Sequence, residues 1–112
     1  ASILSNQVIA VLDMGYTLLE DCSFTRDEAL RATGQLVMRN IENVLEAGCD
    51  GALTGPIERN DIETVKKHIA CMQNDDSDDV RLYKMLGTKL VNIAEKKNPD
   101  KDYTQMMELL RG

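Results

Sequence analysis

One stretch of the sequence combines residue types that could bind a small ligand. Residues 53–61, LTGPIERND, offer the hydroxyl of Thr54, a flexible Gly55, a rigid Pro56 and the guanidinium of Arg59. Because proline lacks an amide hydrogen and disfavours helix at the preceding residue, we expect a loop just before a helix N-terminus. Free amides at such a terminus favour anions, and Arg59 could clamp a carboxylate or phosphate. Composition alone favours the simpler alternative, an ordinary helix–helix loop in which Arg59 pairs with a surface carboxylate.

The only histidine, His68, is the second candidate. It follows Thr64 by one helical turn and Asp61 by two, on a face that also carries Val65 and Met72. A lone histidine on a half-apolar face is usually structural, but an imidazole also suits proton exchange with a bound substrate. We expect Asp61 to cap the helix or to orient His68. No further ligands stand at suitable spacing, so the sequence predicts no metal site.

A polar pair, Ser5 and Asn6, lies in the first turns of an otherwise apolar predicted helix. Polar groups in such surroundings must find partners or face a cavity. Asn6 could therefore hydrogen-bond a carbonyl or hydroxyl group in a cleft, with Ser5 beside it. Fraying and solvent exposure near a chain end would explain the pair equally well.

The elements that position these residues are predicted to be helices. The chain has 112 residues, of which 43% are apolar and 4% aromatic, with no tryptophan. A core of Leu, Ile, Val, Met and Ala favours helix packing over a sandwich or barrel. We expect one all-α domain with about five helices, at residues 2–21, from Thr25 to Gly48, 61–73, 78–97 and 101–111.

Local signals set the ends of these helices. Thr25 and Glu28 form a capping box, and Gly34 within the second helix suggests close packing of another backbone. Residues 48–60 are the only long irregular segment, after which Asn60 or Asp61 caps the third helix, with Glu63 placed to answer Asn60. Apolar residues recur at helical spacing along the last three helices: Ile62, Val65, Ile69 and Met72; Tyr83, Leu86, Leu90 and Ile93; and Tyr103, Met106, Met107 and Leu110.

Charge and cysteine content exclude several classes of function. The net charge of −6 argues against nucleic-acid binding. The sequence has no apolar run of about 20 residues and no basic-then-apolar leader, so we expect no membrane association. Three widely spaced cysteines indicate reduced thiols in a cytoplasmic protein. The acidic run at 73–79 lacks the glycine and glutamate of a calcium loop, and is expected to favour the start of the fourth helix.

The motifs resemble those of a known family, namely the helical domain of unknown function that follows a Rossmann domain in NADP-dependent oxidoreductases. The matching residues occur in the family's order and spacing over nearly the whole chain: Ser5-Asn6, Leu53-Thr54-Gly55-Pro56, Arg59-Asn60-Asp61, Thr64-Val65, His68-Ile69 and Tyr83. Asn60 stands where the family usually has glycine, and asparagine tolerates left-handed backbone better than most residues.

The resemblance implies a bundle like the C-terminal domain of 6-phosphogluconate dehydrogenase. It implies that the chain is the C-terminal half of a two-domain protein. A preceding Rossmann domain would bind most of the NADP, in keeping with the missing GxGxxG motif. This half would supply the dimer interface, through its apolar first helix, and the substrate side of the cleft. Hydride would pass between the nicotinamide and a small carbonyl, imine or hydroxy compound.

Roles for individual residues follow from the same resemblance. Asn6 and His68 are the catalytic candidates, Asn6 by orienting the substrate and His68 as an acid or base. The expected substrate-binding residues are Ser5, Thr54, Gly55, Pro56 and Arg59. Two alternatives stay open: a non-catalytic helical module for dimerisation or ligand binding, and a free-standing helical protein that shares only the architecture.

Overall fold

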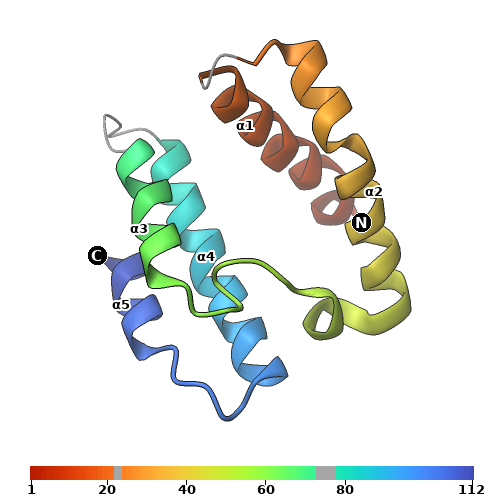
Figure 1. The fold of residues 1–112 in the computed structure, drawn as a ribbon. Coiled ribbons are helices and arrows are strands. Elements are labelled where there is room, and N and C mark those ends of the chain that lie inside the picture. Colours follow the sequence, from red (N-terminus) through yellow and green to blue (C-terminus); the bar gives the residue numbers. More distant parts are fainter. Residues whose placement is uncertain (22–23, 73–77) are drawn as a thin grey trace. The chain divides into compact units, whose positions relative to one another are not determined.

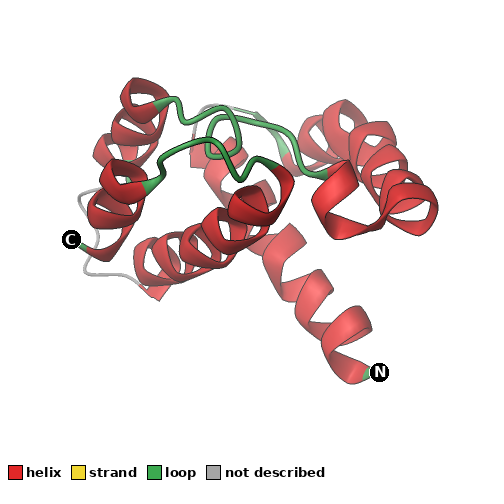
Figure 2. Cartoon of the chain, turned by 90° about the horizontal axis from the view of Figure 1, so that it is seen from below, coloured by secondary structure: helices red, strands yellow, loops and turns green. Residues whose placement is uncertain are grey.

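The computed structural model describes residues 1–21, 24–72 and 78–112, which form helices and loops without strands (Figure 2). The all-α prediction is therefore confirmed for these residues. Residues 73–77 of the expected acidic turn lie outside the described ranges. The helices are η1 (Ile3–Gln7), a π-helical turn, followed by α1 (Val8–Asp21), α2 (Arg26–Ala52), α3 (Ile62–Cys71), α4 (Asp78–Lys97) and α5 (Thr104–Arg111) (Figure 1).

The chain divides into two compact units, Ala1–Glu42 and Asn43–Gly112, here called the N-terminal unit and the C-terminal unit. The boundary falls within α2, which contributes its first part to one unit and its last part to the other. Of the described helices, none has the length and apolar character that a bilayer-crossing segment requires.

The N-terminal unit is a hairpin of α1 and the first part of α2. The predicted capping box is confirmed, because the Glu28 amide donates to Thr25 Oγ1 at 3.1 Å and the Thr25 amide donates to Glu28 Oε1 at 3.0 Å. Arg26 joins the two helices through ion pairs with Asp13, at 3.2 Å, and Glu20, at 2.8 Å. Such partly exposed pairs contribute little each, so they set orientation more than stability.

Most large apolar side chains of this hairpin are exposed. Ala29 is fully buried, whereas Leu4 is 83% exposed and Ile9 is 64% exposed. Gly34 was expected to touch another backbone, but no described atom lies within 4 Å of the position a Cβ would take there. Within this unit, the apolar first helix therefore leaves much of its apolar surface uncovered.

Gly48 ends the regular part of α2, as predicted, but a further helical turn follows it. Its φ of 77° and ψ of 172° lie outside the helical region, and the Leu53 amide then bonds the Cys49 carbonyl at 3.1 Å. Glycine adopts this conformation without the steric penalty of a Cβ. The irregular segment therefore begins at Leu53 and not at residue 48, so the expected loop is shorter than predicted.

The hydrophobic core of the C-terminal unit lies between α3, α4, α5 and the loop before α3. The predicted apolar faces of α3 and α5 are confirmed, with Val65 and Met106 fully buried. On α4 the prediction is wrong by about one residue, since Val91 and Ala94 are buried and Leu90 only partly so. The core residues are Ile57, Val65, Val91, Ala94, Tyr103, Met106 and Leu110.

A small residue explains why the buried face of α4 shifts. A Cβ at Gly87 would stand 2.8 Å from Leu110 Cδ2 and 3.4 Å from Ile57 Cδ1. Leu110 belongs to α5 and Ile57 to the loop before α3, so the bare backbone of Gly87 lets both elements approach α4. Because the apolar pattern of the sequence gives no weight to glycine, it does not predict that the other elements approach α4 at Gly87.

We expect Gly87→Ala to lower the free energy of unfolding of the C-terminal unit by about 1–3 kcal/mol, because the added methyl group overpacks the core. Gly15 offers a matched control, since it is also helical and nothing lies within 4 Å of its would-be Cβ. Gly15→Ala should be neutral or stabilise by up to about 1 kcal/mol. Urea denaturation of both variants measures the two changes in the free energy of unfolding. An equal change at the two sites would contradict the packing argument.

Candidate functional site

The segment singled out by sequence, residues 53–61, is a tightly bonded loop. The Arg59 amide bonds the Gly55 carbonyl at 3.0 Å, and the Asp61 amide bonds the Pro56 carbonyl at 2.8 Å. Gly55 has a φ of 102°, a conformation that residues with a Cβ rarely adopt. Asn60 has a φ of 61°, so the left-handed conformation expected of asparagine at this position is confirmed.

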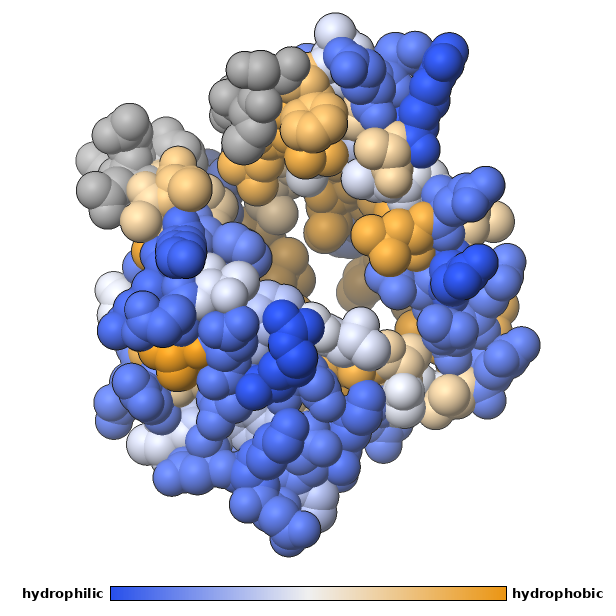
Figure 3. Space-filling view, viewed as in Figure 1, coloured by the Kyte–Doolittle hydropathy of each residue, from blue (hydrophilic) through white to orange (hydrophobic). Residues whose placement is uncertain are grey.

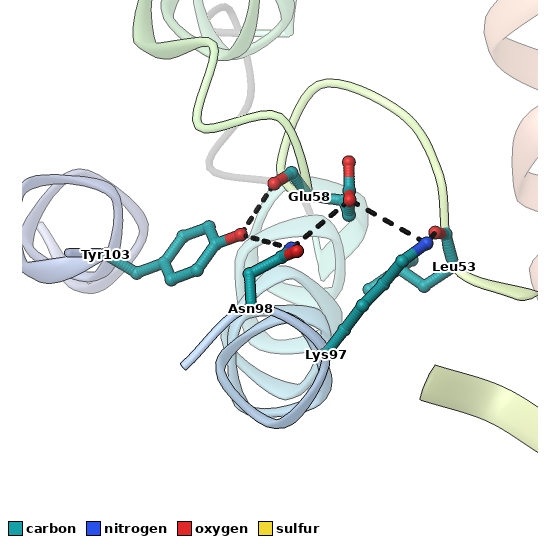
Figure 4. A network of polar contacts seen from close by, with 5 residues as sticks. All are labelled: Leu53, Glu58, Lys97, Asn98 and Tyr103. Carbon is teal, nitrogen blue, oxygen red and sulfur yellow. Dashed lines mark hydrogen bonds and ion pairs between the residues drawn. The ribbon is translucent and has the colours of Figure 1, made fainter. Parts of the chain in front are cut away.

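A polar clamp holds this loop against the end of α4 and the start of α5 (Figure 4). Lys97 Nζ donates to the Leu53 carbonyl at 2.7 Å and lies 3.7 Å from Glu58 Oε1. Asn98 Nδ2 donates to Glu58 Oε1 at 3.2 Å and to the Tyr103 hydroxyl at 3.0 Å. The Tyr103 hydroxyl in turn donates to the Glu58 carbonyl at 2.6 Å. The loop is therefore held at Leu53 and at Glu58 by side chains that stand 40 or more residues later in the chain.

The clamp is partly shielded from water, which strengthens its electrostatic interactions. The side chain of Glu58 is 14% exposed and Tyr103 is 3% exposed. The hydrogen bond from Asn98 and the charge of Lys97 lower the pKa of the Glu58 carboxyl. A satisfied, partly buried network of this kind rigidifies its surroundings, so Thr54, Gly55 and Pro56 sit on a prearranged backbone.

The N-terminus of α3 is capped by Asp61, one of the two predicted caps. Asp61 Oδ1 accepts from the Thr64 amide at 3.1 Å, and Oδ2 accepts from the Thr64 hydroxyl at 2.7 Å. The predicted capping-box hydrogen bond between the Glu63 side chain and Asn60 is not formed. Asn60 instead donates to the Asp102 carbonyl at 2.8 Å, and Glu63 lies 3.7 Å from Lys66. The left-handed turn at Asn60 points its side chain toward the start of α5, away from the helix it was expected to cap.

The same cap weakens the predicted anion site. The carboxylate of Asp61 already occupies the Thr64 amide, and a negative charge at this terminus repels a second anion. Arg59 lies 3.8 Å from Asp61 and keeps 58% of its side chain exposed. The simple alternative, Arg59 paired with a surface carboxylate, is thus present, while the exposed guanidinium keeps its capacity to bind an anionic substituent.

His68 and Tyr83 are brought together by the packing of α3 against α4. The Nδ1 atom of His68 lies 3.2 Å from the Tyr83 hydroxyl, and the two rings meet edge to face at 81°. His68 is exposed, whereas Tyr83 is half-buried, and burial raises the pKa of the Tyr83 phenol. Sequence reasoning placed Tyr83 in a core stripe and in the family pattern, but it did not pair the two residues, which stand 15 positions apart.

Ser5 and Asn6 belong to the N-terminal unit and lie within the π-helical turn η1. Both are exposed, and the Ser5 hydroxyl donates to the Ala1 carbonyl at 3.2 Å. The assignment of Ser5 and Asn6 to the substrate stays a prediction.

The described residues include no strand from which a glycine-rich phosphate loop could lead into a helix, and the amide end of α3 is taken by Asp61. In the same described ranges, no three acidic, cysteine or histidine side chains gather to hold a metal ion. A groove of about 590 Å³ runs beside α5, lined by Lys101, Asp102, Glu108 and Arg111 among others, and it brings together none of the predicted site residues.

We expect the C-terminal unit to lose stability as the pH falls below about 4, the ordinary pKa of an aspartate carboxyl. Hydrogen bonds from Thr64 lower the pKa of Asp61, and those from Thr104 lower the pKa of Asp102. A carboxylate whose pKa is lower in the folded than in the unfolded chain stabilises the fold at any pH above the unfolded-state pKa. This stabilisation is lost as the pH falls through the pKa of the folded state. Asp61→Asn keeps a capping oxygen without this titration, so its pH dependence, measured by urea denaturation between about pH 3 and pH 7, should be shallower. A slope identical to that of the parent would contradict this assignment.

Comparison with known proteins identifies the family to which this chain belongs. Residues 1–90 match the family described as Domain of unknown function (DUF2520), and this chain is a member of it. The searches of curated proteins and of solved structures found no match. The match ends within α4, so the clamp residues Lys97, Asn98 and Tyr103 lie beyond it.

Proposed function

We propose that this DUF2520 domain is the substrate-side and dimerisation domain of a cytoplasmic NAD(P)-dependent oxidoreductase. The observation that carries the proposal is the His68–Tyr83 pair, an exposed imidazole held by a half-buried phenol. His68 follows the cap residue Asp61 by seven residues, which along a helix corresponds to about 10 Å. The imidazole of His68 thus stands on α3, the helix into which the rigid, polar loop 53–61 leads.

Each residue has a defined task in this proposal. His68 supplies a proton or hydrogen bond to the reacting oxygen or nitrogen of the substrate. Thr54, Gly55 and Pro56 shape the wall of the cleft, and exposed Arg59 binds an anionic substituent. The role given to Asn6 and Ser5, orientation of the substrate by hydrogen bonds, comes from the resemblance alone. The NADP itself is assigned to a preceding Rossmann domain, as the resemblance to NADP-dependent oxidoreductases implies.

Dimerisation is supported by the many exposed apolar side chains of the N-terminal unit, and Figure 3 shows several groups of apolar atoms on the face in view. Patches of this kind on a soluble protein usually mark an interaction site. We assign the surface to a second copy of the chain, in keeping with the resemblance that places the first helix at a dimer interface. The exposed large apolar residues of this unit are Ile3, Leu4, Val8, Ile9, Val11, Phe24, Leu30, Leu36, Met38 and Ile41.

The chain should therefore sediment as a dimer, and Ile41→Glu should shift it toward the monomer. Ile41 is 46% exposed on α2, and a charge buried there without a partner would oppose association. Leu82→Glu is the control, because Leu82 is 37% exposed but lies on α4 in the C-terminal unit. Analytical ultracentrifugation of the three proteins gives the result. A parent chain that is monomeric at high micromolar concentration would rule out this role for the surface.

The mass of the native polypeptide tests the two-domain proposal most directly. Mass spectrometry of the protein isolated from its own cells should give a polypeptide near 30 kDa, roughly two domains of ordinary size. That polypeptide should bind NADPH, as followed by nicotinamide fluorescence. A native mass of 12.5 kDa, the mass of this chain alone, would remove the nucleotide site and end the proposal.

A second function, a non-catalytic module for dimerisation or ligand binding, is favoured by one observation. The exposed apolar surface of the N-terminal unit suits assembly whether or not a reaction takes place. In this case Arg59→Ala and His68→Ala would leave turnover by the full polypeptide intact, while changes in the apolar surface would alter its assembly. The two functions therefore differ in their response to the same substitutions.

A further inference from the structure

The direction of the hydrogen bond between His68 and Tyr83 decides what His68 can offer a ligand. The bond uses Nδ1 of the imidazole, so Nε2 is the remaining ring nitrogen. In a neutral histidine one nitrogen carries the proton and the other accepts, and the partner of one sets the state of the other. If Tyr83 donates to Nδ1, then Nε2 carries the proton; if Tyr83 accepts, then Nε2 is a bare acceptor.

Relative acidity favours donation by Tyr83. A phenol, with an ordinary pKa of about 10, is a far stronger acid than the N–H of a neutral imidazole. The imidazole nitrogen is also the better acceptor of the two groups. Burial raises the pKa of the Tyr83 phenol further, so it keeps its proton at neutral pH and remains a donor.

We propose that Tyr83 is a positioning residue that donates its hydroxyl hydrogen to Nδ1 of His68 and fixes the neutral imidazole as the Nε2–H tautomer. His68 then presents an N–H donor, which suits a substrate with a carbonyl oxygen and not a hydroxyl group awaiting deprotonation. This inference rests on the proposed function for its substrate, a carbonyl compound undergoing reduction. As negative charge develops on the carbonyl oxygen, the hydrogen bond from Nε2–H strengthens. When Nε2 gives its proton to that oxygen, Nδ1 takes the hydroxyl proton of Tyr83, which solvent then replaces, so the imidazole stays neutral.

The location of His68 suggests a rival state. The residue lies in the last turn of α3, where the helix dipole favours a positive charge. A charged imidazolium would donate from both nitrogens, and the Tyr83 hydroxyl would then accept. The two states differ in the protonation of Nδ1, which is a measurable property.

Nitrogen NMR of the imidazole tests the proposal without any substrate or cofactor. Because His68 is the only histidine, a chain labelled with ¹⁵N-histidine gives one imidazole spectrum. At about pH 8.5 an ordinary imidazole is neutral. The chemical shifts should show Nδ1 unprotonated and Nε2 protonated, with a tautomer ratio about three- to tenfold above that of the same chain unfolded in urea.

Two variants test whether the Tyr83 hydroxyl causes the tautomer ratio of His68. In Tyr83→Phe the ratio should fall about three- to tenfold, because the donor is removed while the ring remains. Tyr16→Phe removes a hydroxyl from the N-terminal unit and should leave the ratio unchanged. If Tyr83→Phe does not fold, the comparison of the parent in buffer and in urea still decides the matter.

Three results would overturn the proposal: a proton on Nδ1 in the folded parent, a ratio equal to that in urea, or a ratio unaffected in folded Tyr83→Phe. Each would leave the native mass and NADPH binding of the full polypeptide untouched. Conversely, a polypeptide of 12.5 kDa would end the oxidoreductase assignment while the tautomer of His68 stayed as measured. Failure of the inference and failure of the proposed function are therefore distinguishable.

Discussion

Replacing Met106 by alanine should lower the free energy of unfolding of the C-terminal unit by about 3 kcal/mol, within a range of roughly 2–5 kcal/mol. Met106 is fully buried and lies in the core with Val65, Val91 and Leu110. Its truncation removes apolar contacts and leaves a cavity that the surrounding helices fill only in part. A unit of this size is expected to be stable by roughly 4–10 kcal/mol, so the loss is a large share of the total.

Met85 provides the matched control for this change. It is also a methionine within a helix, but it is 65% exposed. Met85→Ala should therefore change the free energy of unfolding by no more than about 0.5 kcal/mol. Urea denaturation followed by circular dichroism measures both values. Equal losses in the two variants would show that the core does not lie where α4 and α5 place it.

The sequence predicted the features that depend on neighbouring residues. The box of Thr25 and Glu28 needs only three residues, and it is formed as expected. The fourth helix, predicted at 78–97, has those bounds, because an acidic first turn and the Asn98-Pro99 pair mark its ends locally. The all-α class followed from the shortage of aromatic residues and from apolar residues at helical spacing.

Features that depend on tertiary approach were missed. Nothing in the sequence pairs Lys97 with the Leu53 carbonyl, since 44 residues separate them and the acceptor is backbone. The choice of Asp61 over Asn60 as the cap of α3 depends on the Asp102 carbonyl, which attracts the Asn60 amide from across the fold. Local rules ranked the two caps equally because this competing partner lies far away in the chain.

In the candidate site, too, the features set by neighbouring residues were predicted and those set by tertiary packing were not. The loop and α3 were identified from residue types, and the structure joins them in one unit with His68 two turns after the cap. The pairing of His68 with Tyr83 required α3 and α4 to pack with a particular rotation about their axes. The apolar pattern predicts which face of a helix is buried only to within about one residue, since the buried face of α4 lies one residue from the predicted one.

Replacing His68 by glutamine should lower kcat of the full polypeptide by about 100-fold or more, in the range of roughly 10²–10⁴ for loss of an acid–base group. Glutamine can hydrogen-bond, but it cannot exchange a proton near neutral pH. Because the reduction in turnover reflects the reaction step, KM should change much less than kcat. His68 is exposed, so the substitution should leave the fold intact.

The measurement is the oxidation of NADPH in the presence of small keto acids, aldehydes and cyclic imines. Lys67→Gln is the control, since Lys67 precedes His68 on α3, is also exposed, and becomes the same residue. Unchanged kcat in both variants would make His68 a structural residue and favour the non-catalytic module. A loss confined to His68→Gln, with normal urea denaturation, would place the imidazole at the reacting atoms. Together with the Nε2–H tautomer expected from Tyr83, that result would identify His68 as the proton donor to a substrate carbonyl.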